Sequence, residues 1–196
     1  MISKMAIFSC FDVETTSLDA KKGQVIEIAI VKVNSNGDFL DEWTTLVGPT
    51  PIDLGRPDIH GIKSSWLDSA PNFKQIAGDI SEKFDGSIPV AHNAPFDCGF
   101  IREEWNKAGL GDLQLEAFDT LPLAKGLGYP GKLVELSEAL GVELSNAHEA
   151  LADTHALASV LIKLLDSSNT KVDSPVFQPS LFTPDASGLF ELRPAI

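Results

Sequence analysis

Residues Ala6–Phe11 form an apolar run that leads directly into Asp12-Val13-Glu14, followed by two threonines. An apolar run of this length with aromatic residues is typical of a strand that is buried on both faces. Because side chains alternate along a strand, Asp12 and Glu14 should point to the same face. Two carboxylates placed there repel each other and lose hydration, unless a divalent cation lies between them. The run therefore predicts a central strand that ends in a metal site. The alternative is a solvated strand end with two surface acids.

The charge of the chain limits what it can bind. Its 196 residues are enough for one domain with a substantial core and a short tail. The net charge is −13, because 28 acidic residues face 15 lysines and arginines. A protein that wraps duplex nucleic acid normally presents a basic face. We therefore expect weak intrinsic binding to nucleic acid, assisted by metal ions and by tethering to a partner.

Cys10 and Cys98 are the two cysteines, and both lie in apolar segments. This arrangement predicts reduced core thiols rather than a disulfide framework or a zinc site. No apolar run reaches the length of a membrane span, and the N-terminus lacks the layout of a signal peptide. The expected localisation is cytoplasmic, without a membrane partner.

The hydrophobic pattern after the first strand predicts an α/β fold. Two strands joined at the hairpin signal Asn36-Gly37 extend the first into an antiparallel meander, and Pro49–Ile62 reads as a loop that precedes a helical turn at Ser64–Leu67. The expected strands are Gln24–Val33, Phe39–Val47, Ile88–His92 and Leu115–Phe118. The expected helices are Pro71–Phe84, Pro95–Ala108, Thr120–Lys125, Leu133–Leu140 and Asn146–Asp166, with Asn93 as the N-cap of the second.

Two more acids are expected on the inner faces of helices. Asp97 shares the side of Ile101 by four-residue spacing, and Asp153 precedes Leu157 by the same step. His148 lies five residues before Asp153, a step of about 140° on a regular helix. It should therefore lie in the lead-in or the first turn and approach a common centre from another side.

This set of side chains is suited to phosphoryl chemistry. Two hard cations could be bound by the carboxylate oxygens of Asp12, Glu14, Asp97 and Asp153. Two ions about 4 Å apart can stabilise the attacking and leaving oxygens of an in-line displacement. His148 is a suitable general base for the attacking water, because an imidazole has an ordinary pKa of about 6.5. Glu27, inside the second strand, is assigned to the edge of the site or to solvent, not to the metal.

These residues lie in three motifs that resemble those of the DEDDh 3′-to-5′ exonuclease family. The motifs are Phe11–Thr16, His92–Asp97 and His148–Asp153. The resemblance extends from about Met5 to about Leu165, and it is strongest to the proofreading (epsilon) subunit of bacterial DNA polymerase III and its free-standing relatives. The sister class with tyrosine four residues before the last aspartate is excluded.

The resemblance implies a ribonuclease-H-like fold, a mixed five-stranded sheet flanked by helices, and two Mg²⁺ or Mn²⁺ ions. It implies that Asp12 bridges both ions and that Glu14 holds one of them. Asp153 would act on the first ion, Asp97 on the second, and His148 would be the base. The residues implied to lie near the terminal nucleotide are Thr15, Thr16, His60, Asn93 and Phe96.

Two residues depart from the pattern of many relatives. Val13 replaces a threonine, and it should point away from the acids. Ser17 replaces a glycine and could change the turn that receives the terminal base, which leaves the substrate preference open.

The composition changes at Ser167, so a Pro- and Ser-containing tail is expected to follow an exonuclease domain of residues 1–166. The segment Gln178-Pro179-Ser180-Leu181-Phe182 resembles the peptide by which bacterial replication proteins bind the sliding clamp. Gln178, Leu181 and Phe182 would then be the partner-binding residues, with apolar anchors filling a preformed groove. The alternative is that Leu181 and Phe182 pack back on the domain.

The leading hypothesis is a metal-dependent exonuclease that hydrolyses single-stranded DNA from its 3′ end to nucleoside 5′-monophosphates, in proofreading or repair. A DNA polymerase subunit would be a further partner. The first alternative is the same reaction on RNA, because the contacts to a 2′-hydroxyl lie in loops that the sequence does not place. The second is an inactive exonuclease-like adaptor, against which the retention of all the chemical residues argues.

Overall fold

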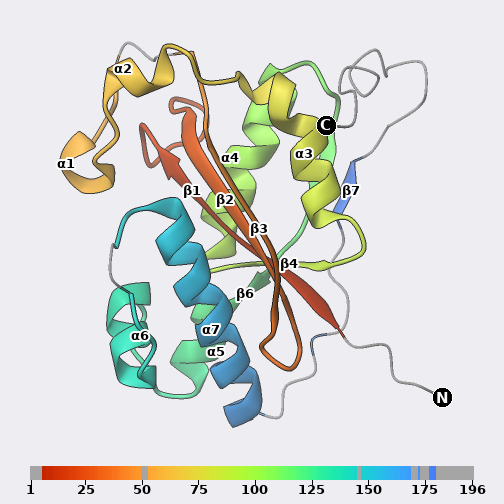
Figure 1. Ribbon diagram of the computed structural model, residues 1–196, viewed down its shortest axis with the longest axis vertical. Helices are drawn as coiled ribbons and strands as arrows, with labels where there is room; N and C mark the ends of the chain where they lie inside the picture. The colour runs from red at the N-terminus through yellow and green to blue at the C-terminus, as the bar shows by residue number, and fades with distance from the viewer. Residues whose placement is uncertain (1–5, 50–52, 145–146, 169–171, 173–176, 180–196) are drawn as a thin grey trace.

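The structure is a computed structural model that describes residues 6–49, 53–144, 147–168, 172 and 177–179. Its centre is a mixed sheet of five strands in the order β3-β2-β1-β4-β6 (Figure 1). The antiparallel part consists of β1 (Ile7–Thr15), β2 (Val25–Asn34) and β3 (Phe39–Leu46), and the parallel part adds β4 (Ile88–Ala91) and β6 (Phe118–Asp119). The predicted α/β class and the predicted mixed sheet are confirmed.

Helices cover both faces of the sheet (Figure 1). On one face lie α3 (Phe73–Phe84) and α4 (Ala94–Lys107). On the other lies α7 (Ala150–Ser168), which also packs against α5 (Thr120–Gly126) and α6 (Leu133–Leu140). The site described below lies where β1 ends, next to the beginnings of α4 and α7.

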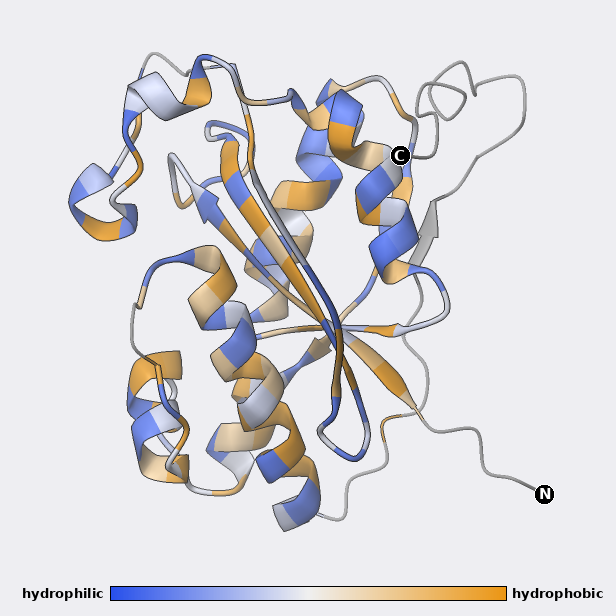
Figure 2. Ribbon diagram, viewed as in Figure 1, coloured by the Kyte–Doolittle hydropathy of each residue, from blue (hydrophilic) through white to orange (hydrophobic). Residues whose placement is uncertain are grey.

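The alternation of side chains along β1 separates two hydrophobic clusters. Phe8 and Cys10 pack in the cluster that includes α7, whereas Phe11 packs in the cluster that includes α3 and α4. Figure 2 shows hydrophobic residues interleaved with polar ones along the strands of the sheet. Because every second residue shares a face, Asp12 and Glu14 continue the α7 face of β1. The prediction that Asp12 and Glu14 share one face rests on this alternation.

The predicted strand at Leu115–Phe118 is wrong, because the segment forms two strands. β5 (Leu113–Leu115) pairs with β7 (Phe177–Pro179) in a separate antiparallel sheet, while β6 joins the main sheet. Leu113 and Leu115 are buried and Gln114 is exposed. The leucines pack in the hydrophobic cluster that includes α3 and α4, whereas the backbone of β6 pairs with β4.

A short helix, α1 (Pro57–His60), lies in the segment predicted to be loop, ahead of α2 (Ser64–Leu67). Pro57 fits the first helical position because its missing N–H would have no partner there. Gly61 ends the helix with a φ of 68°, a left-handed conformation that glycine adopts without steric cost.

The ends of two other helices differ from the prediction. α3 begins at Phe73, two residues after Pro71, because the side chain of Asn72 accepts a hydrogen bond from the Gln75 N–H and forms a capping box. α7 begins at Ala150, because His148 has a φ of 71° and cannot be helical. His148 therefore lies in the lead-in to the helix, as predicted.

Cys10 and Cys98 are both free and buried, and burial raises the pKa of both thiols, which fits the predicted core role. Within the described part of the chain, no helix combines the length and the apolar character that a bilayer crossing requires.

Candidate active site

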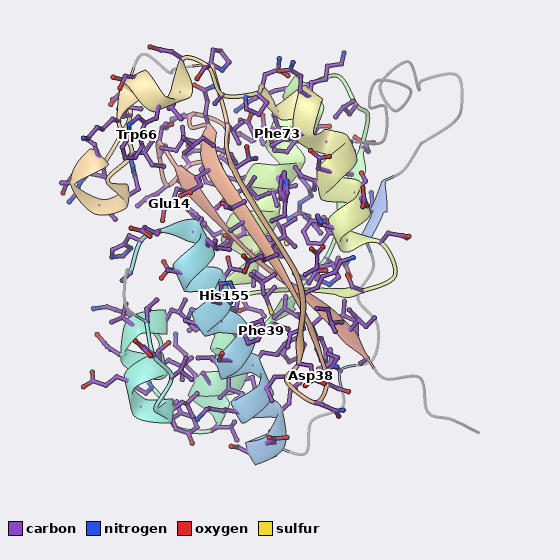
Figure 3. All side chains as sticks on the ribbon, viewed as in Figure 1. Glu14, Asp38, Phe39, Trp66, Phe73 and His155 are labelled. Atoms are coloured by element: carbon purple, nitrogen blue, oxygen red, sulfur yellow. The ribbon has the colours of Figure 1, made fainter. Side chains whose placement is uncertain are left out.

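Three elements bring the predicted chemical residues together. Asp12 and Glu14 lie at the end of β1, Asp97 in the first turn of α4, and Asp153 in the first turn of α7. Glu14, His148 and Asp153 each place one potential ligand atom so that all three atoms lie within 4.8 Å of one another. Figure 3 labels Glu14 where β1 ends, beside the start of α7.

Two hydrogen bonds from the backbone fix the aspartates of the helices. The Val13 N–H donates to Asp97 Oδ1 (3.2 Å), which ties the start of α4 to β1. The His148 N–H donates to Asp153 Oδ2 (3.0 Å) across the lead-in to α7. The other oxygen, Asp153 Oδ1, is buried and has no hydrogen-bond partner among the described residues. A buried carboxylate oxygen in this state is costly unless a cation binds it.

The pKa values of the carboxyl groups are raised throughout the site. Burial raises the pKa of Glu14 to about 8, assisted by the negative charges of Asp153 and Glu27. Burial also raises the pKa of Asp97 to about 8. Burial, and after it the charge of Asp97, raises the pKa of Asp12 well above its usual range. Burial and mutual repulsion therefore disfavour several ionised carboxyl groups at this place, and a divalent cation with oxygen ligands fits the cluster.

Glu27 lies at the edge of this site, as predicted. It is the partner of Glu14 in the antiparallel register of β1 and β2. Its Oε2 accepts a hydrogen bond of 3.4 Å from the Ala150 N–H, at the first residue of α7. Burial raises its pKa, and its charge in turn raises the pKa of Glu14. Glu27 thus links β2 to the helix that holds Asp153.

Asp119 supports the site and was not found from the sequence. Its Oδ1 accepts hydrogen bonds from the Asn93 N–H (2.9 Å) and from the Leu121 N–H (2.9 Å). The first bond fixes the turn that begins α4, and the second caps α5. An aspartate directly before a helix was the available signal. Asn93 does occupy the predicted N-cap position, but with a φ of 71° and without a capping bond from its side chain.

Next to the carboxylates is a cavity of about 180 Å³, formed by the end of β1, the turn after it, α1 and the start of α4. Four of the five residues predicted to lie near the terminal nucleotide line it, namely Thr15, Thr16, His60 and Phe96. Asn93 is exposed and is not part of this lining. Four lining residues were missed, namely Val13, Leu18, Arg56 and Ile59, whereas Ser17 lines the cavity as part of the turn predicted to receive the terminal base. Leu18 is 89% exposed, and an apolar residue in a polar turn was the one signal for it.

The polar groups around the cavity are already engaged in holding its shape. Thr15 Oγ1 donates to the Ser17 carbonyl (2.8 Å), and Thr16 Oγ1 accepts from the Gln24 N–H (3.0 Å). His60 Nδ1 accepts from the Ile62 N–H (3.0 Å). The proton of this ring is therefore on Nε2, which lies 3.1 Å from the Leu54 carbonyl. Direct contacts of these side chains with a nucleotide stay a prediction.

Comparisons with known proteins identify the family of the chain. Residues 9–161 match the RNase_T family, described as exonuclease. A DNA polymerase III of the PolC type from Bacillus cereus is 36% identical over 160 residues, which cover 79% of this chain and 11% of that protein. The chain thus spans about a tenth of the length of the curated relatives that it matches.

Solved structures share the fold. Exonuclease X, solved in complex with 5′-overhanging duplex DNA, has 26% sequence identity to this chain and a TM-score of 0.67. The match covers 84% of this chain and 94% of that one. A 3′-exonuclease that recognises the 3′ end of a histone mRNA stem-loop is 17% identical, with coverages of 85% and 84% and a TM-score of 0.72, and supports the fold alone. The chain therefore belongs to the exonuclease family, and its fold is that of the DEDD-type 3′-to-5′ exonucleases.

Proposed function

We propose that this protein is a divalent-metal-dependent exonuclease that removes nucleotides from the 3′ end of single-stranded DNA and releases nucleoside 5′-monophosphates. The observation that supports the proposal most is the meeting of four carboxylates from β1, α4 and α7 beside the cavity at the end of β1. Among them, Asp153 Oδ1 is buried without a hydrogen-bond partner in the described part of the chain.

The carboxylates provide the ligands for two cations. Asp12, Glu14, Asp97 and Asp153 would hold Mg²⁺ or Mn²⁺, because hard cations prefer carboxylate oxygens. Such ions, when bound, polarise a phosphoryl oxygen and lower the pKa of water. Burial is the main cause of the raised pKa values of Glu14 and Asp97, and bound cations would favour the ionised carboxylates in spite of it.

His148 is proposed as the general base. Its side chain is exposed, and one of its ring nitrogens lies within 4.8 Å of ligand oxygens of Glu14 and Asp153. An imidazole at this place can accept the proton of an attacking water and pass it to solvent. The backbone N–H of the same residue holds Asp153, so the base and one ligand are fixed together.

The cavity beside the carboxylates is proposed to receive the terminal nucleotide. Phe96 and the largely exposed Leu18 offer apolar surface on which a base can stack. The net charge of −13 disfavours tight binding of a duplex. DNA is favoured over RNA because the 36% identical relative is a DNA polymerase, and exonuclease X was solved with DNA. We further propose a DNA polymerase partner, because that relative is named as a DNA polymerase, and a cytoplasmic location.

Digestion of matched DNA and RNA oligomers tests the proposal. Both carry a 5′ label and are incubated with Mg²⁺, with Mn²⁺, and with EDTA. A ladder that shortens from the 3′ end of the DNA, and that EDTA abolishes, is the expected result. Faster shortening of RNA at equal concentration would make the enzyme an exoribonuclease. Binding of the ends without any hydrolysis would instead support the adaptor alternative.

A further inference from the structure

A second cavity, of about 600 Å³, lies on the other side of the turn that follows β1. Its lining includes four lysines, namely Lys21, Lys22, Lys74 and Lys107. These are four of the 15 basic residues of a chain whose net charge is −13. Among the described residues, Glu104 is the one acid in the lining. We call this feature the lysine cavity; Phe73, labelled in Figure 3 at the start of α3, is part of its wall.

Lys107 holds the wall of the lysine cavity in place. Its Nζ donates to the carbonyls of Gly23 (2.8 Å) and Ala20 (3.3 Å), and it is 3.1 Å from Glu104 Oε1. These contacts fasten the turn to the end of α4. A Cβ at Gly23 would lie 2.8 Å from the Cβ of Ser17, so the turn also packs closely on itself. The charge of Lys107 is compensated by Glu104.

The other lysines are available for an anion. Lys21 and Lys74 are exposed, and within the described ranges neither side chain forms an ion pair or a hydrogen bond. Lys22 pairs with Asp19 at 3.3 Å, but both side chains are largely solvated, with 80% and 48% of their surface exposed. Exposed pairs of this kind contribute about 0–1 kcal/mol and exchange readily. An anion with several charges would therefore find up to three ammonium groups at one place.

The lysine cavity and the cavity beside the carboxylates are separated by one turn. Ser17 and Leu18 line the cavity beside the carboxylates. Lys21 and Lys22 of the same turn line the lysine cavity. The base of the turn is closed by hydrogen bonds of 3.0 Å between Thr16 and Gln24 in both directions. Nucleic acid that extends past Leu18 from the carboxylate site would bring its next phosphates toward the lysines.

We propose that the lysine cavity binds the phosphodiester backbone of the nucleic acid beyond the terminal nucleotide. The inference depends on the proposed function, since it names a second contact for the same substrate. It explains how a protein with a net charge of −13 can retain a polyanion. The backbone could belong to the strand that is cut or to a complementary strand, and the two sources are separated below.

The test compares Lys21→Ala/Lys74→Ala with Lys132→Ala/Lys163→Ala, which makes the same change in net charge at the N-cap of α6 and in the C-terminal half of α7. Neither Lys132 nor Lys163 lines either cavity. The substrates are a trinucleotide, a single strand of twelve nucleotides, and that strand annealed to a template with a mismatched 3′ end. KM and kcat are measured at several salt concentrations. The full chain is used throughout.

The Lys21→Ala/Lys74→Ala variant should have a KM several-fold higher for the longer substrates and an unchanged KM for the trinucleotide. The slope of log KM against log salt should fall by roughly 1.4, because each single-strand phosphate contact contributes about 0.7. An effect on the single strand assigns the cavity to the strand that is cut. An effect confined to the annealed substrate assigns it to the template.

Three outcomes overturn the inference. The first is an unchanged KM and salt slope for every substrate, and the second is an equal effect of the control variant. The third is a rise in the KM of the trinucleotide equal to that of the longer substrates, which would mean that the lysines act through the structure of the site. A wild-type protein that cuts none of the substrates with metal present would instead refute the proposed function itself.

Discussion

At the level of single residues, Asp12 is surrounded by other acids. After burial, the charges of Asp97 and Glu14 are the largest causes of its raised pKa. We predict that Asp12→Asn lowers kcat by about 10³-fold, because a metal ligand supplies several kcal/mol of transition-state stabilisation. The fold should persist, and the melting temperature in EDTA should not fall, since the substitution removes repulsion. Hydrolysis at the parental rate with Mg²⁺ would refute the assignment.

His148 differs from the carboxylates because its proposed task is to move a proton. We predict that His148→Gln lowers kcat by about 10²–10⁴-fold, the range for loss of a general base. The rise in melting temperature that Mg²⁺ causes should remain, because the carboxylates are intact. Both quantities can be measured on one preparation. If the Mg²⁺ response disappears together with activity, His148 is a metal ligand, which its distance to Glu14 and Asp153 would also allow.

At the level of elements, the loop before α1 closes one side of the cavity beside the carboxylates. Gly55 has a φ of 73°, and a Cβ there would lie 2.1 Å from the Thr16 carbonyl oxygen. Gly61 has a similar φ of 68°, but a Cβ would meet nothing within 4 Å. Gly61→Ala therefore changes only the backbone preference, which is about 1–2 kcal/mol.

We predict that Gly55→Ala destabilises the protein by more than Gly61→Ala, by about 1–3 kcal/mol in addition, because overpacking adds to the strain. It should also raise KM for a single-stranded oligomer, since Thr16 lines the cavity. Chemical denaturation and steady-state kinetics of the two variants provide the comparison. Equal stability of the two would mean that the loop moves away from Thr16 at little cost.

The elements with a clear period could be predicted from the sequence. Leu133–Leu140 and the three strands of the meander were found within one residue at each end, because burial imposes a period on their side chains. The split between β5 and β6 could not be found, since it depends on pairing with β7, some 60 positions later in the sequence. Pairing partners so distant in sequence leave no local pattern.

The candidate site likewise contains residues that could be predicted from the sequence and residues whose placement depends on distant contacts. The acids and His148 could be predicted because each has a fixed spacing from an apolar face or from another motif residue. Glu27 could be placed at the edge, but its bond to the Ala150 N–H requires β2 and α7 to meet. Arg56 and Ile59, at the N-cap of α1 and within it, could not be assigned to the cavity beside the carboxylates, because the loop before α1 approaches the Thr16 backbone closely at Gly55. Tertiary contacts of loops are not encoded in periodicity.

At the level of the whole molecule, the first residues of the proposed clamp peptide belong to a strand that pairs with β5. Gln178 belongs to β7 and is opposite Gln114 of β5, while Leu181 and Phe182 lie outside the described residues. We predict that Leu181→Ala/Phe182→Ala abolishes binding to a sliding clamp and leaves turnover on a short oligomer unchanged. Point substitutions are preferable to a deletion because they keep β7. Clamp binding equal to that of the parent protein would discard the clamp hypothesis.

The stability of the whole molecule should depend on pH in a direction that the carboxylate cluster sets. The pKa of Glu14 rises from an ordinary 4.5 to about 8, and that of Asp97 from 3.8 to about 8. Between these limits the folded protein retains protons that the unfolded chain has released. The free energy of unfolding of the metal-free protein should therefore be highest near the acid limit and should fall as the pH rises toward about 8.

Divalent cations should reverse this trend, because they bind the deprotonated carboxylates and so stabilise the folded state more as the pH rises. Melting temperatures at about pH 5 and about pH 8, measured in EDTA and in Mg²⁺, provide the test. The variant Glu14→Gln/Asp97→Asn should remove most of the pH dependence in EDTA and most of the gain from Mg²⁺. Glu135→Gln, on the exposed side of α6, should change neither. A metal-free melting temperature that rises across this range would show that these carboxyl groups are ionised without a cation. The cluster would then not require a metal.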